Sequence, residues 1–331
     1  MTETFTAMMI EDVDGKPRAG FKDIALADLP DYPVLVEISH STLNYKDGLA
    51  ITGRGRIARR LPMVAGIDLA GIVVEDRSGA WKAGDKVILN GFGLSETEWG
   101  AYSRFQRVRP EWLLRLPTAF TPAQAMGIGT AGYTAALCVM ALENWGTIQK
   151  DRREVLVTGA AGGVGSTAIS LLAKRGYKVT AATGRPETHA YLSELGATAF
   201  VGRSELAEKG TPLQKERWAG VVDSVGSTTL ANAIAQTVYG GAVAACGLAG
   251  GADLPGTVLP HILRSVALLG VDSVAAPIER RQLAWNLLAE SLDTAQLDRI
   301  TRTEPMSSLP ELAKEIIAGN VRGRIIIEIG K

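Results

Sequence analysis

The sequence predicts an α/β protein in which a compact, mostly-β domain is followed by a doubly wound parallel sheet. The length of 331 residues fits about two domains of ordinary size. In roughly the first third of the chain, short apolar runs with β character are broken by glycine, proline and aspartate. Further along, apolar strands alternate with helical segments, which is typical of a parallel sheet covered by helices on both faces.

The first domain is expected to contain strands at "PVLVEISHS", "DLAGIVVED", "GDKVILN" and "GAYSRFQRV". After them, "TPAQAMGIGTAGYTAALCVMALENWG" predicts a long apolar helix. Thr121 and Pro122 are typical of a helix start, and Gly146 is typical of a helix end. We expect this helix to bridge the two domains.

The second domain is expected to contain strands at "EVLVTG", "YKVTAAT", "TAFV", "AGVVDSVG", "GAVAACGL" and "VALLGVDS". The last of these could pair across the edge of a homodimer. The C-terminal segment predicts a helix closed by Gly319 and a final strand that returns to either domain. We place the first domain at residues 1–125 with 300–331 and the second at 126–299.

Composition narrows the classes of partner. Lys+Arg and Asp+Glu both number 35, so no net charge favours nucleic acid or an anionic membrane. The N-terminus lacks the features of a signal peptide, and no run of about 18 apolar residues appears, so we expect a cytoplasmic protein. The cysteines, Cys138 and Cys246, are expected to be small buried hydrophobes, and no cysteine or histidine shows the spacing of metal ligands. We therefore expect no metal.

A glycine turn stands between an apolar strand and a helix in "VLVTGAAGGVGSTAISLLAKRG". Against the pattern G-x-G-x-x-G the frame is Ala160, Gly162 and Gly165, with Gly159 and Gly163 adding freedom to the turn. In this strand–turn–helix context the motif predicts a dinucleotide site with the pyrophosphate at the helix N-terminus.

The corner after the next strand distinguishes the two nicotinamide cofactors. An acidic residue there normally binds the ribose hydroxyls of NAD, but this chain has Thr183 and Arg185, and Glu187 comes only after a proline. A hydroxyl and a guanidinium suit a 2′-phosphate, so the sequence predicts NADPH. The alternative is that Arg185 only faces solvent.

Several strings over nearly the whole chain carry a family resemblance: "LNYKDGLAITGRGRI", "PMVAGIDLAG", "VLVTGAAGGVGSTA", "ILRSVALLGVDSV" and "ERRQLAW". They resemble a zinc-free branch of the medium-chain dehydrogenase/reductase superfamily, the NADPH-dependent acrylyl-CoA reductases and their quinone-oxidoreductase-like relatives. The resemblance implies a GroES-like mostly-β catalytic domain and a Rossmann domain. Zinc alcohol dehydrogenases of the superfamily carry a His-Glu pair where Ile67 and Asp68 stand here, so the resemblance also implies no zinc.

The activity implied is reduction of the C=C bond of acryloyl-CoA to propanoyl-CoA, with hydride added to the β-carbon and a proton to the α-carbon. Hydride addition to an alkene conjugated with a carbonyl spreads charge into an enolate, which hydrogen bonds can stabilise without a metal. An NADPH:quinone or enone reductase is the nearest alternative. A non-catalytic NADPH-binding redox sensor is the second.

Three residues at the start of the first helix are the catalytic candidates. Tyr45 carries a phenol that stays protonated at neutral pH and can donate to substrate or cofactor. Its alternative role is an aromatic that packs on the cofactor without chemistry. Asn44 and Asp47 are expected to cap the helix or to position Tyr45.

The resemblance also implies a set of cofactor contacts spread along the chain. Arg203 has an independent rationale, because it follows the third strand and could reach the adenosine phosphate or stack on the adenine. The implied contacts are Tyr45, Ala161, Gly162, Gly163, Val164, Thr183, Gly184, Arg185, Arg203, Leu248, Ile262, Ser273 and Asn320.

The densest basic run of the chain follows the first predicted helix. It contains Arg54, Arg56, Arg59 and Arg60, with Lys46 shortly before it. The neighbouring glycines favour a loop. These arginines could bind the phosphates of an acyl-CoA substrate, or they could be an ordinary solvated surface.

Overall fold

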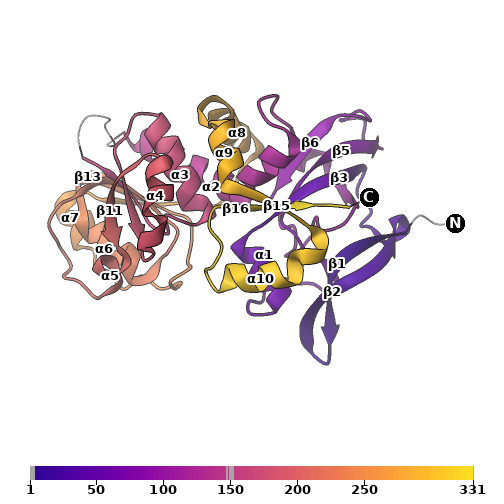
Figure 1. Cartoon of the computed structure of the whole chain (residues 1–331), viewed down its shortest axis with the longest axis horizontal. Coiled ribbons are helices and arrows are strands. Elements are labelled where there is room, and N and C mark those ends of the chain that lie inside the picture. The colour runs from indigo at the N-terminus through magenta and orange to yellow at the C-terminus, as the bar shows by residue number, and fades with distance from the viewer. Residues whose placement is uncertain (1–3, 147, 149–152, 331) are drawn as a thin grey trace. The chain divides into compact units, whose positions relative to one another are not determined.

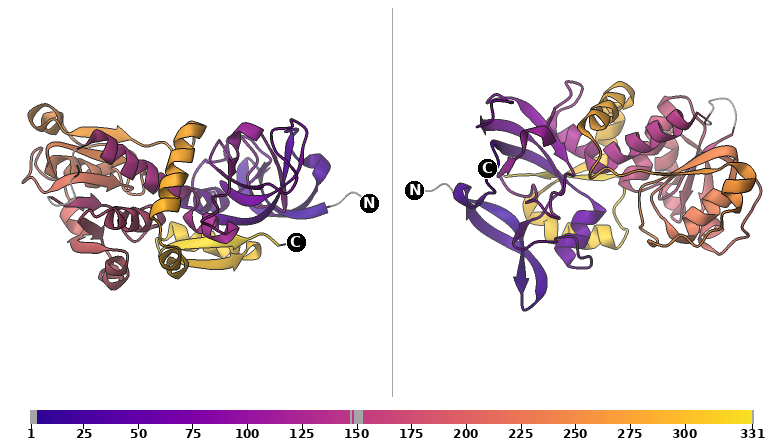
Figure 2. Two further views of the ribbon diagram at one scale, coloured as in Figure 1. Left: turned by 90° about the horizontal axis from the view of Figure 1, so that it is seen from above. Right: turned by 180° about the vertical axis from the view of Figure 1, so that it is seen from behind.

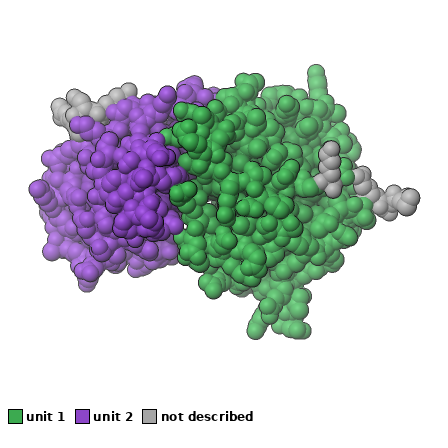
Figure 3. Space-filling model, viewed as in Figure 1, with its two compact units in different colours: residues 1–130, 273–283, 293–331 green, residues 131–272, 284–292 purple. Residues whose placement is uncertain are grey.

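The computed structural model describes residues 4–146, 148 and 153–330, and the chain divides into two compact units (Figures 1 and 3). The first unit comprises Met1–Thr130, Ser273–Leu283 and Asp293–Lys331, and the second comprises Ala131–Asp272 and Ala284–Leu292. This division differs from the predicted boundaries, because residues 126–130, 273–283 and 293–299 belong to the first unit. The helices at 122–145 and 278–291 each begin in one unit and end in the other. The pattern of apolar residues continues along such a helix, so it does not show where one unit ends and the other begins.

The first unit is built on two sheets, as the predicted mostly-β domain requires. The larger has the order β15-β16-β3-β5-β6-β8, and β7 also pairs with β3. Its strands are β3 (Val34–Leu43), β5 (Asp68–Asp76), β6 (Lys86–Asn90), β7 (Phe105–Val108), β8 (Leu114–Arg115), β15 (Thr301–Pro305) and β16 (Arg324–Glu328). A smaller sheet contains β1 (Thr4–Val13), β2 (Lys16–Ala25) and β4 (Met63–Val64). The four strands expected between residues 33 and 108 are therefore confirmed.

Helices and turns complete the first unit. Helix α1 (Tyr45–Thr52) follows β3, and α9 (Thr294–Ile300) and α10 (Leu309–Ile317) lie near the C-terminus. Gly319, with a φ of 75°, follows α10, and β16 then pairs between β15 and β3. The predicted final helix and strand are confirmed, and the strand returns to the first unit. Short 3-10 turns of this unit occupy Leu26–Asp28, Pro110–Trp112 and Met306–Ser308, and another in the second unit occupies Pro186–Thr188.

The second unit contains the predicted parallel sheet, and the helices between its strands lie against it (Figure 2). The order β11-β10-β9-β12-β13-β14 is that of a doubly wound fold with a switch point between β9 and β12. The strands are β9 (Val155–Val157), β10 (Val179–Thr183), β11 (Ala197–Gly202), β12 (Trp218–Asp223), β13 (Thr237–Ala245) and β14 (Ala267–Gly270). The helices are α3 (Gly163–Lys174), α4 (His189–Glu194), α5 (Arg203–Ala207), α6 (Ser227–Gln236) and α7 (Leu259–Arg264).

The long apolar segment forms α2 (Pro122–Trp145), and α8 (Ile278–Ser291) is the other helix shared between the units. Thr121 accepts a hydrogen bond from Gln124 N at 3.1 Å, which confirms the predicted cap. The expected continuous helix is wrong in one respect, because Gly129 has non-helical angles (φ 50°, ψ −162°) and breaks it. By length and composition α2 could cross a membrane, but 89% of its most apolar window is buried inside the protein.

Each unit has its own apolar core. In the first, Met8, Val36 and Leu89 belong to a cluster formed by both sheets, and in the second Leu156 and Val243 pack with helical side chains. Cys138 is fully buried, as expected, whereas Cys246 is only partly buried and lies 3.3 Å from the carbonyl oxygen of Asp223.

Candidate functional site

The glycine turn joins β9 to α3 as the motif predicts. Gly159 has a φ of 58°, and its carbonyl oxygen accepts from Gly162 N at 2.9 Å. A Cβ atom at Gly165 would lie 2.5 Å from that oxygen and 2.7 Å from Cα of Ala160, so only glycine fits there. The helix begins at Gly163, and its N-terminal N–H groups follow directly on the turn. These residues form a cradle that suits a pyrophosphate.

A buried aspartate, which the sequence analysis did not single out, stabilises the region of this turn. Asp223 ends β12, accepts from Thr158 Oγ1 at 2.7 Å, and accepts from Gly226 N at 2.8 Å. Burial raises the pKa of this carboxyl, and its hydrogen bonds oppose that rise. Asp223 therefore joins the carboxyl ends of two neighbouring strands at the switch point. A lone acid at the end of the apolar run "AGVVD" was the available signal.

The residues predicted to recognise the 2′-phosphate lie together at the carboxyl end of β10. Thr183 Oγ1 accepts from Arg185 N at 3.2 Å. A Cβ atom at Gly184 would lie 3.1 Å from both Cβ and Cδ of Arg203, so the arginine stem lies against this glycine. Arg185 and Arg203 thus both lie next to Gly184, and no acidic residue directly follows β10.

Two further predicted cofactor contacts are exposed. Leu248 lies in the loop after β13 with its side chain 59% exposed, and Ile262 lies on α7 with its side chain 67% exposed. The Cα atom of Leu248 is close to the turn at Gly226, where an added Cβ would meet it at 3.3 Å. The contacts of both residues with a cofactor stay predictions.

In the first unit, Asn44 and Asp47 form the predicted helix cap. Asp47 Oδ2 accepts from Asn44 N at 2.8 Å and from Asn44 Nδ2 at 3.0 Å, while Oδ1 accepts from Ile67 N at 3.1 Å. Asp47 is fully buried. Burial and then the neighbouring charge of Asp68 raise the pKa of Asp47 to about 7. Both side chains are engaged within the protein, as expected for groups that position a neighbour.

Asp68 is the centre of a buried polar network that the sequence did not reveal. Its carboxylate accepts from Asn44 Nδ2 at 2.7 Å and from Asn90 Nδ2 at 2.5 Å. It also accepts from Thr130 Oγ1 at 2.6 Å and from Thr130 N at 3.1 Å. The donors come from the N-cap of α1, from β6 and from α2, so one carboxylate links three elements.

A buried cation completes this network. Arg324, the first residue of β16, is 3% exposed and donates through Nη2 to Thr42 Oγ1 at 2.8 Å and to Asn44 Oδ1 at 3.1 Å. Burial lowers the pKa of the guanidinium, and the charges of Asp68 and Asp47 oppose that change. An arginine directly before the apolar run "III" was the sequence signal for this role.

Tyr45, the first residue of α1, differs from its neighbours in exposure. The residue is 42% exposed, and its hydroxyl has no hydrogen-bond partner within the described part of the chain. The phenol is therefore available to a ligand, which agrees with either predicted role.

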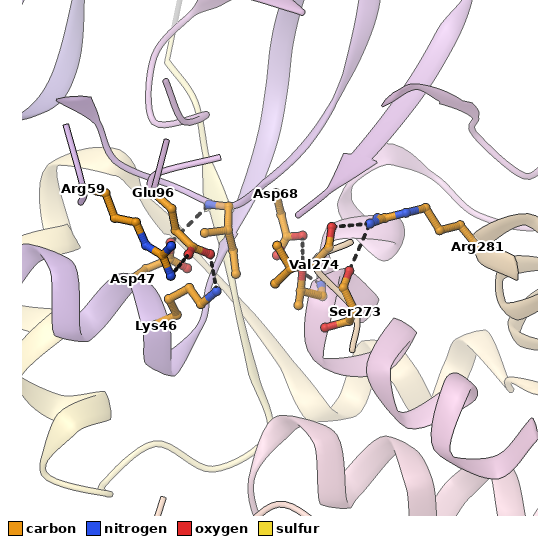
Figure 4. Close-up of polar contacts among 10 residues, drawn as sticks. Lys46, Asp47, Arg59, Asp68, Glu96, Ser273, Val274 and Arg281 are labelled. Carbon is orange, nitrogen blue, oxygen red and sulfur yellow. Dashed lines mark hydrogen bonds and ion pairs between the residues drawn. The ribbon is translucent and has the colours of Figure 1, made fainter. Parts of the chain in front are cut away.

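The basic run forms a loop after α1, as the glycines indicated. Glu96 pairs with Lys46 of α1 and with Arg59 of this loop: Lys46 Nζ lies 2.5 Å and Arg59 Nη2 lies 3.9 Å from the carboxylate (Figure 4). The other three arginines are exposed and have no ionic partner among the residues that the structure describes; they are Arg54, Arg56 and Arg60.

Ser273 and Asn320 both belong to the first unit. Ser273 is partly buried, and its carbonyl oxygen accepts from Arg281 Nη2 at 3.1 Å (Figure 4). Asn320 is exposed in the turn after α10, where its N–H donates to the carbonyl oxygen of Glu315 at 3.0 Å. Within residues 4–146, 148 and 153–330, no group of three or more His, Cys, Asp or Glu side chains is placed to hold a metal ion.

Comparison with known proteins places both units in characterised families. Residues 30–149 match the model of the alcohol dehydrogenase GroES-like domain, and residues 163–290 match that of the zinc-binding dehydrogenases. The acrylyl-CoA reductase AcuI of Ruegeria pomeroyi is 47% identical over 328 residues, which cover 98% of this chain and 99% of that protein.

Two solved structures share the fold at similar identity. The Escherichia coli protein YhdH with bound NADPH has a TM-score of 0.95 at 47% identity, over 98% of this chain and 100% of that one. The Bacillus subtilis protein YhfP with bound NAD has a TM-score of 0.94 at 39% identity, over 99% and 100%. YhfP is described as a putative quinone oxidoreductase. The expected GroES-like and Rossmann domains are confirmed, and the chain belongs to the medium-chain dehydrogenase/reductase superfamily, within the family of acrylyl-CoA reductases and their quinone-oxidoreductase-like relatives.

Proposed function

We propose that this protein is an NADPH-dependent reductase that converts acryloyl-CoA to propanoyl-CoA. The observation that carries the proposal is the 47% identity with AcuI over nearly all of both chains. The candidate site supports it, because the chain has a pyrophosphate cradle, a cationic adenosine corner, an available phenol and an exposed basic loop.

The residues present fit NADPH. The turn at Gly159–Gly165 and the N-terminus of α3 suit the pyrophosphate, and Arg185 and Arg203 suit the 2′-phosphate. The absence of an acid directly after β10 removes the charge that would repel that phosphate. NADPH rather than NADH is therefore the proposed cofactor, although the relative YhfP was crystallised with NAD.

The proposed reaction adds a hydride and a proton across the alkene. Bound NADPH supplies the hydride for the β-carbon of the acryloyl group. Tyr45 donates the proton to the α-carbon, and its phenol is then reprotonated from solvent, to which its side chain is 42% exposed. Asn44 and Asp47 hold the start of α1 and so fix where the phenol projects. We also propose that no zinc takes part, because the carboxylate of Asp68 is already engaged by protein donors.

The exposed arginines of the loop after α1 form the proposed binding surface for the coenzyme A part of the substrate. Arg54, Arg56 and Arg60 would meet the phosphates of coenzyme A, whereas Lys46 and Arg59 are already paired with Glu96. A quinone or enone reductase is the alternative function, which the name of the relative YhfP favours. The substrate of such an enzyme carries no phosphates, so these arginines would not contribute to its binding.

One assay separates these functions. Oxidation of the cofactor is followed with acryloyl-CoA, crotonyl-CoA and a benzoquinone, with NADPH and NADH side by side. We expect the highest kcat/KM with acryloyl-CoA and NADPH. A higher kcat/KM with the benzoquinone than with either thioester would refute the proposal in favour of a quinone reductase.

Assembly and location complete the proposal. We infer a homodimer formed through β14, because this strand lies at the edge of its sheet and Leu268 on it is 38% exposed. Light scattering of the purified protein should give twice the chain mass, and Leu268→Glu should give the monomer. An unchanged mass in that variant would contradict this interface. We further propose a cytoplasmic protein without nucleic-acid or membrane partners, because a net charge of zero gives no overall attraction to these polyanionic surfaces.

A further inference from the structure

A buried arginine on α8 donates hydrogen bonds to backbone carbonyl oxygens of two separate segments. Arg281 is 2% exposed. Its Nε donates to Ala276 O at 2.8 Å, and its Nη2 donates to Val274 O at 2.6 Å and to Ser273 O at 3.1 Å. Its Nη1 donates to the carbonyl oxygen of Asn90, the last residue of β6. Figure 4 shows the guanidinium directed at Ser273 and Val274. The planar fork thus bonds both segments at once.

The two segments also contact each other directly. Phe92 N donates to Val274 O at 3.0 Å, and the ring of Phe92 lies under the guanidinium, with 3.7 Å from its centroid to Cζ of Arg281. A Cβ atom at Gly91 would lie 3.0 Å from Ser273 O. The end of β6 with the residues after it (90–92) and the segment at 273–276 are therefore closely packed, and Arg281 bonds to both.

A continuous set of hydrogen bonds leads from this arginine to the start of α1. Arg281 holds the backbone of Asn90, whose side chain donates to Asp68 Oδ1 at 2.5 Å. Asp68 in turn accepts from Asn44, the cap residue directly before Tyr45. All these residues lie in the first unit. Ser273 and Tyr45, two residues predicted to contact the cofactor, are thus held by one buried network.

We propose that Arg281 is a positioning residue for NADPH, which holds the segment 273–276 so that Ser273 meets the cofactor in register with Tyr45. The proposal rests on the proposed contact between Ser273 and NADPH. A lysine at this position could not reach all four carbonyl oxygens, because its single ammonium lacks the fork geometry. The segment 273–276 would then lose hydrogen bonds to its carbonyl oxygens and shift relative to β6.

The expected kinetic signature is a loss of cofactor affinity. Ser273 is not proposed to act on the reacting atoms, so its contact stabilises the bound cofactor equally before and during the reaction. Losing such an interaction raises KM and leaves kcat nearly unchanged. A merely structural role would instead reduce the active fraction, which lowers the apparent kcat and leaves KM unchanged.

The test compares Arg281→Lys and Arg281→Met with Arg280→Met, a matched change at the adjacent, exposed arginine of the same helix. The dissociation constant of NADPH is measured by fluorescence titration, and KM and kcat are measured at saturating acryloyl-CoA. We expect Arg281→Lys to raise the dissociation constant and KM for NADPH by about tenfold, the effect of losing roughly one charged hydrogen bond, with kcat within about twofold. Arg281→Met should raise them further, and Arg280→Met should match the wild type. An unchanged dissociation constant in Arg281→Lys would overturn the proposal.

A measurement on the unaltered protein covers the case in which the variants do not fold. Hydrogen exchange of the Phe92 amide, which donates to Val274 O, should slow when NADPH is added. Unchanged exchange at this amide would also overturn the proposal. Because titration and exchange need no acyl-CoA, they can succeed even when acryloyl-CoA is not turned over, and in that case only the proposed function fails.

Discussion

The side-chain amide of Asn44 donates to the carboxylate of Asp68 across 2.7 Å, deep in the first unit. The same nitrogen donates to Asp47, and the amide oxygen accepts from Arg324. One neutral side chain therefore separates two buried carboxylates and links them to a buried cation. Because the two acids lie close together, ionisation of one is costly while the other is charged.

The pH dependence of stability should report this arrangement. Asp47 has a pKa of about 7 in the folded protein, against a reference value of 3.8 that applies when unfolded. Between these values the folded state binds more protons than the unfolded state, so stability should fall as pH rises from about 4 to about 7 and then level off. Urea unfolding across this range should show the slope. Asp47→Asn should reduce it, whereas Asp14→Asn, an exposed change, should leave it intact. An equal slope in Asp47→Asn would contradict the assignment.

Gly129 should be intolerant of any side chain. Its φ of 50° with ψ of −162° is open essentially to glycine alone, and a Cβ there would lie 2.6 Å from Thr42 Cγ2 and 2.7 Å from Arg324 Nη2. We expect Gly129→Ala to lower the free energy of unfolding by about 3 kcal/mol, from strain and overpacking together. Gly20→Ala, where an added Cβ meets nothing within 4 Å, is the control. Equal urea midpoints for the two variants would contradict the prediction.

Tyr45→Phe separates the two roles of the phenol. If the hydroxyl donates the proton, kcat with acryloyl-CoA should fall by about 100-fold, while the dissociation constant of NADPH stays nearly the same because the ring is retained. Stopped-flow kinetics and fluorescence titration measure the two quantities. Tyr32→Phe, which removes a hydroxyl bonded to Glu98, controls for general loss of a phenol. A wild-type kcat in Tyr45→Phe would leave this residue as a packing aromatic.

Arg185→Ala should reduce the preference for NADPH. Removing a charged partner of the 2′-phosphate should raise KM for NADPH by about tenfold or more and leave KM for NADH nearly unchanged. Arg299→Ala, at an exposed position on α9, should change neither. Parallel Michaelis curves with both cofactors decide the matter, and an equal rise for both would mean that Arg185 does not recognise the phosphate.

The three exposed arginines of the loop after α1 should act on the thioester alone. Changing Arg54, Arg56 and Arg60 together to glutamine should raise KM for acryloyl-CoA by about tenfold at low salt, the sum of three weak surface pairs. Added salt should raise KM of the wild type and have less effect on the variant. A triple change at the exposed Arg18, Arg280 and Arg299 is the matched control. A benzoquinone should show neither effect, and equal salt dependence for both substrates would rule out the role.

The local features of this protein could be predicted from the sequence because neighbouring residues create them. The strand, glycine turn and helix at residues 155–174, the cap formed by Asn44 and Asp47, and the helix ends at Gly146 and Gly319 all depend on backbone freedom or contacts within a few residues. The missing acid after β10 is equally local. These features were enough to predict a dinucleotide-binding domain, whereas the predicted boundaries between the two domains differ from those of the structure.

Tertiary structure alone decided the features that join distant segments. Asp68 meets donors from positions 24 residues before it and 62 residues after it, and Arg324 reaches Asn44 across 280 residues of chain. The spacing of apolar and polar residues along the sequence does not indicate which distant residues form such pairs. The break of α2 at Gly129 and the pairing of Glu96 with Lys46 also depend on what packs opposite. A residue's own type fixes its hydrogen-bonding capacity, but only folding determines which partners satisfy it.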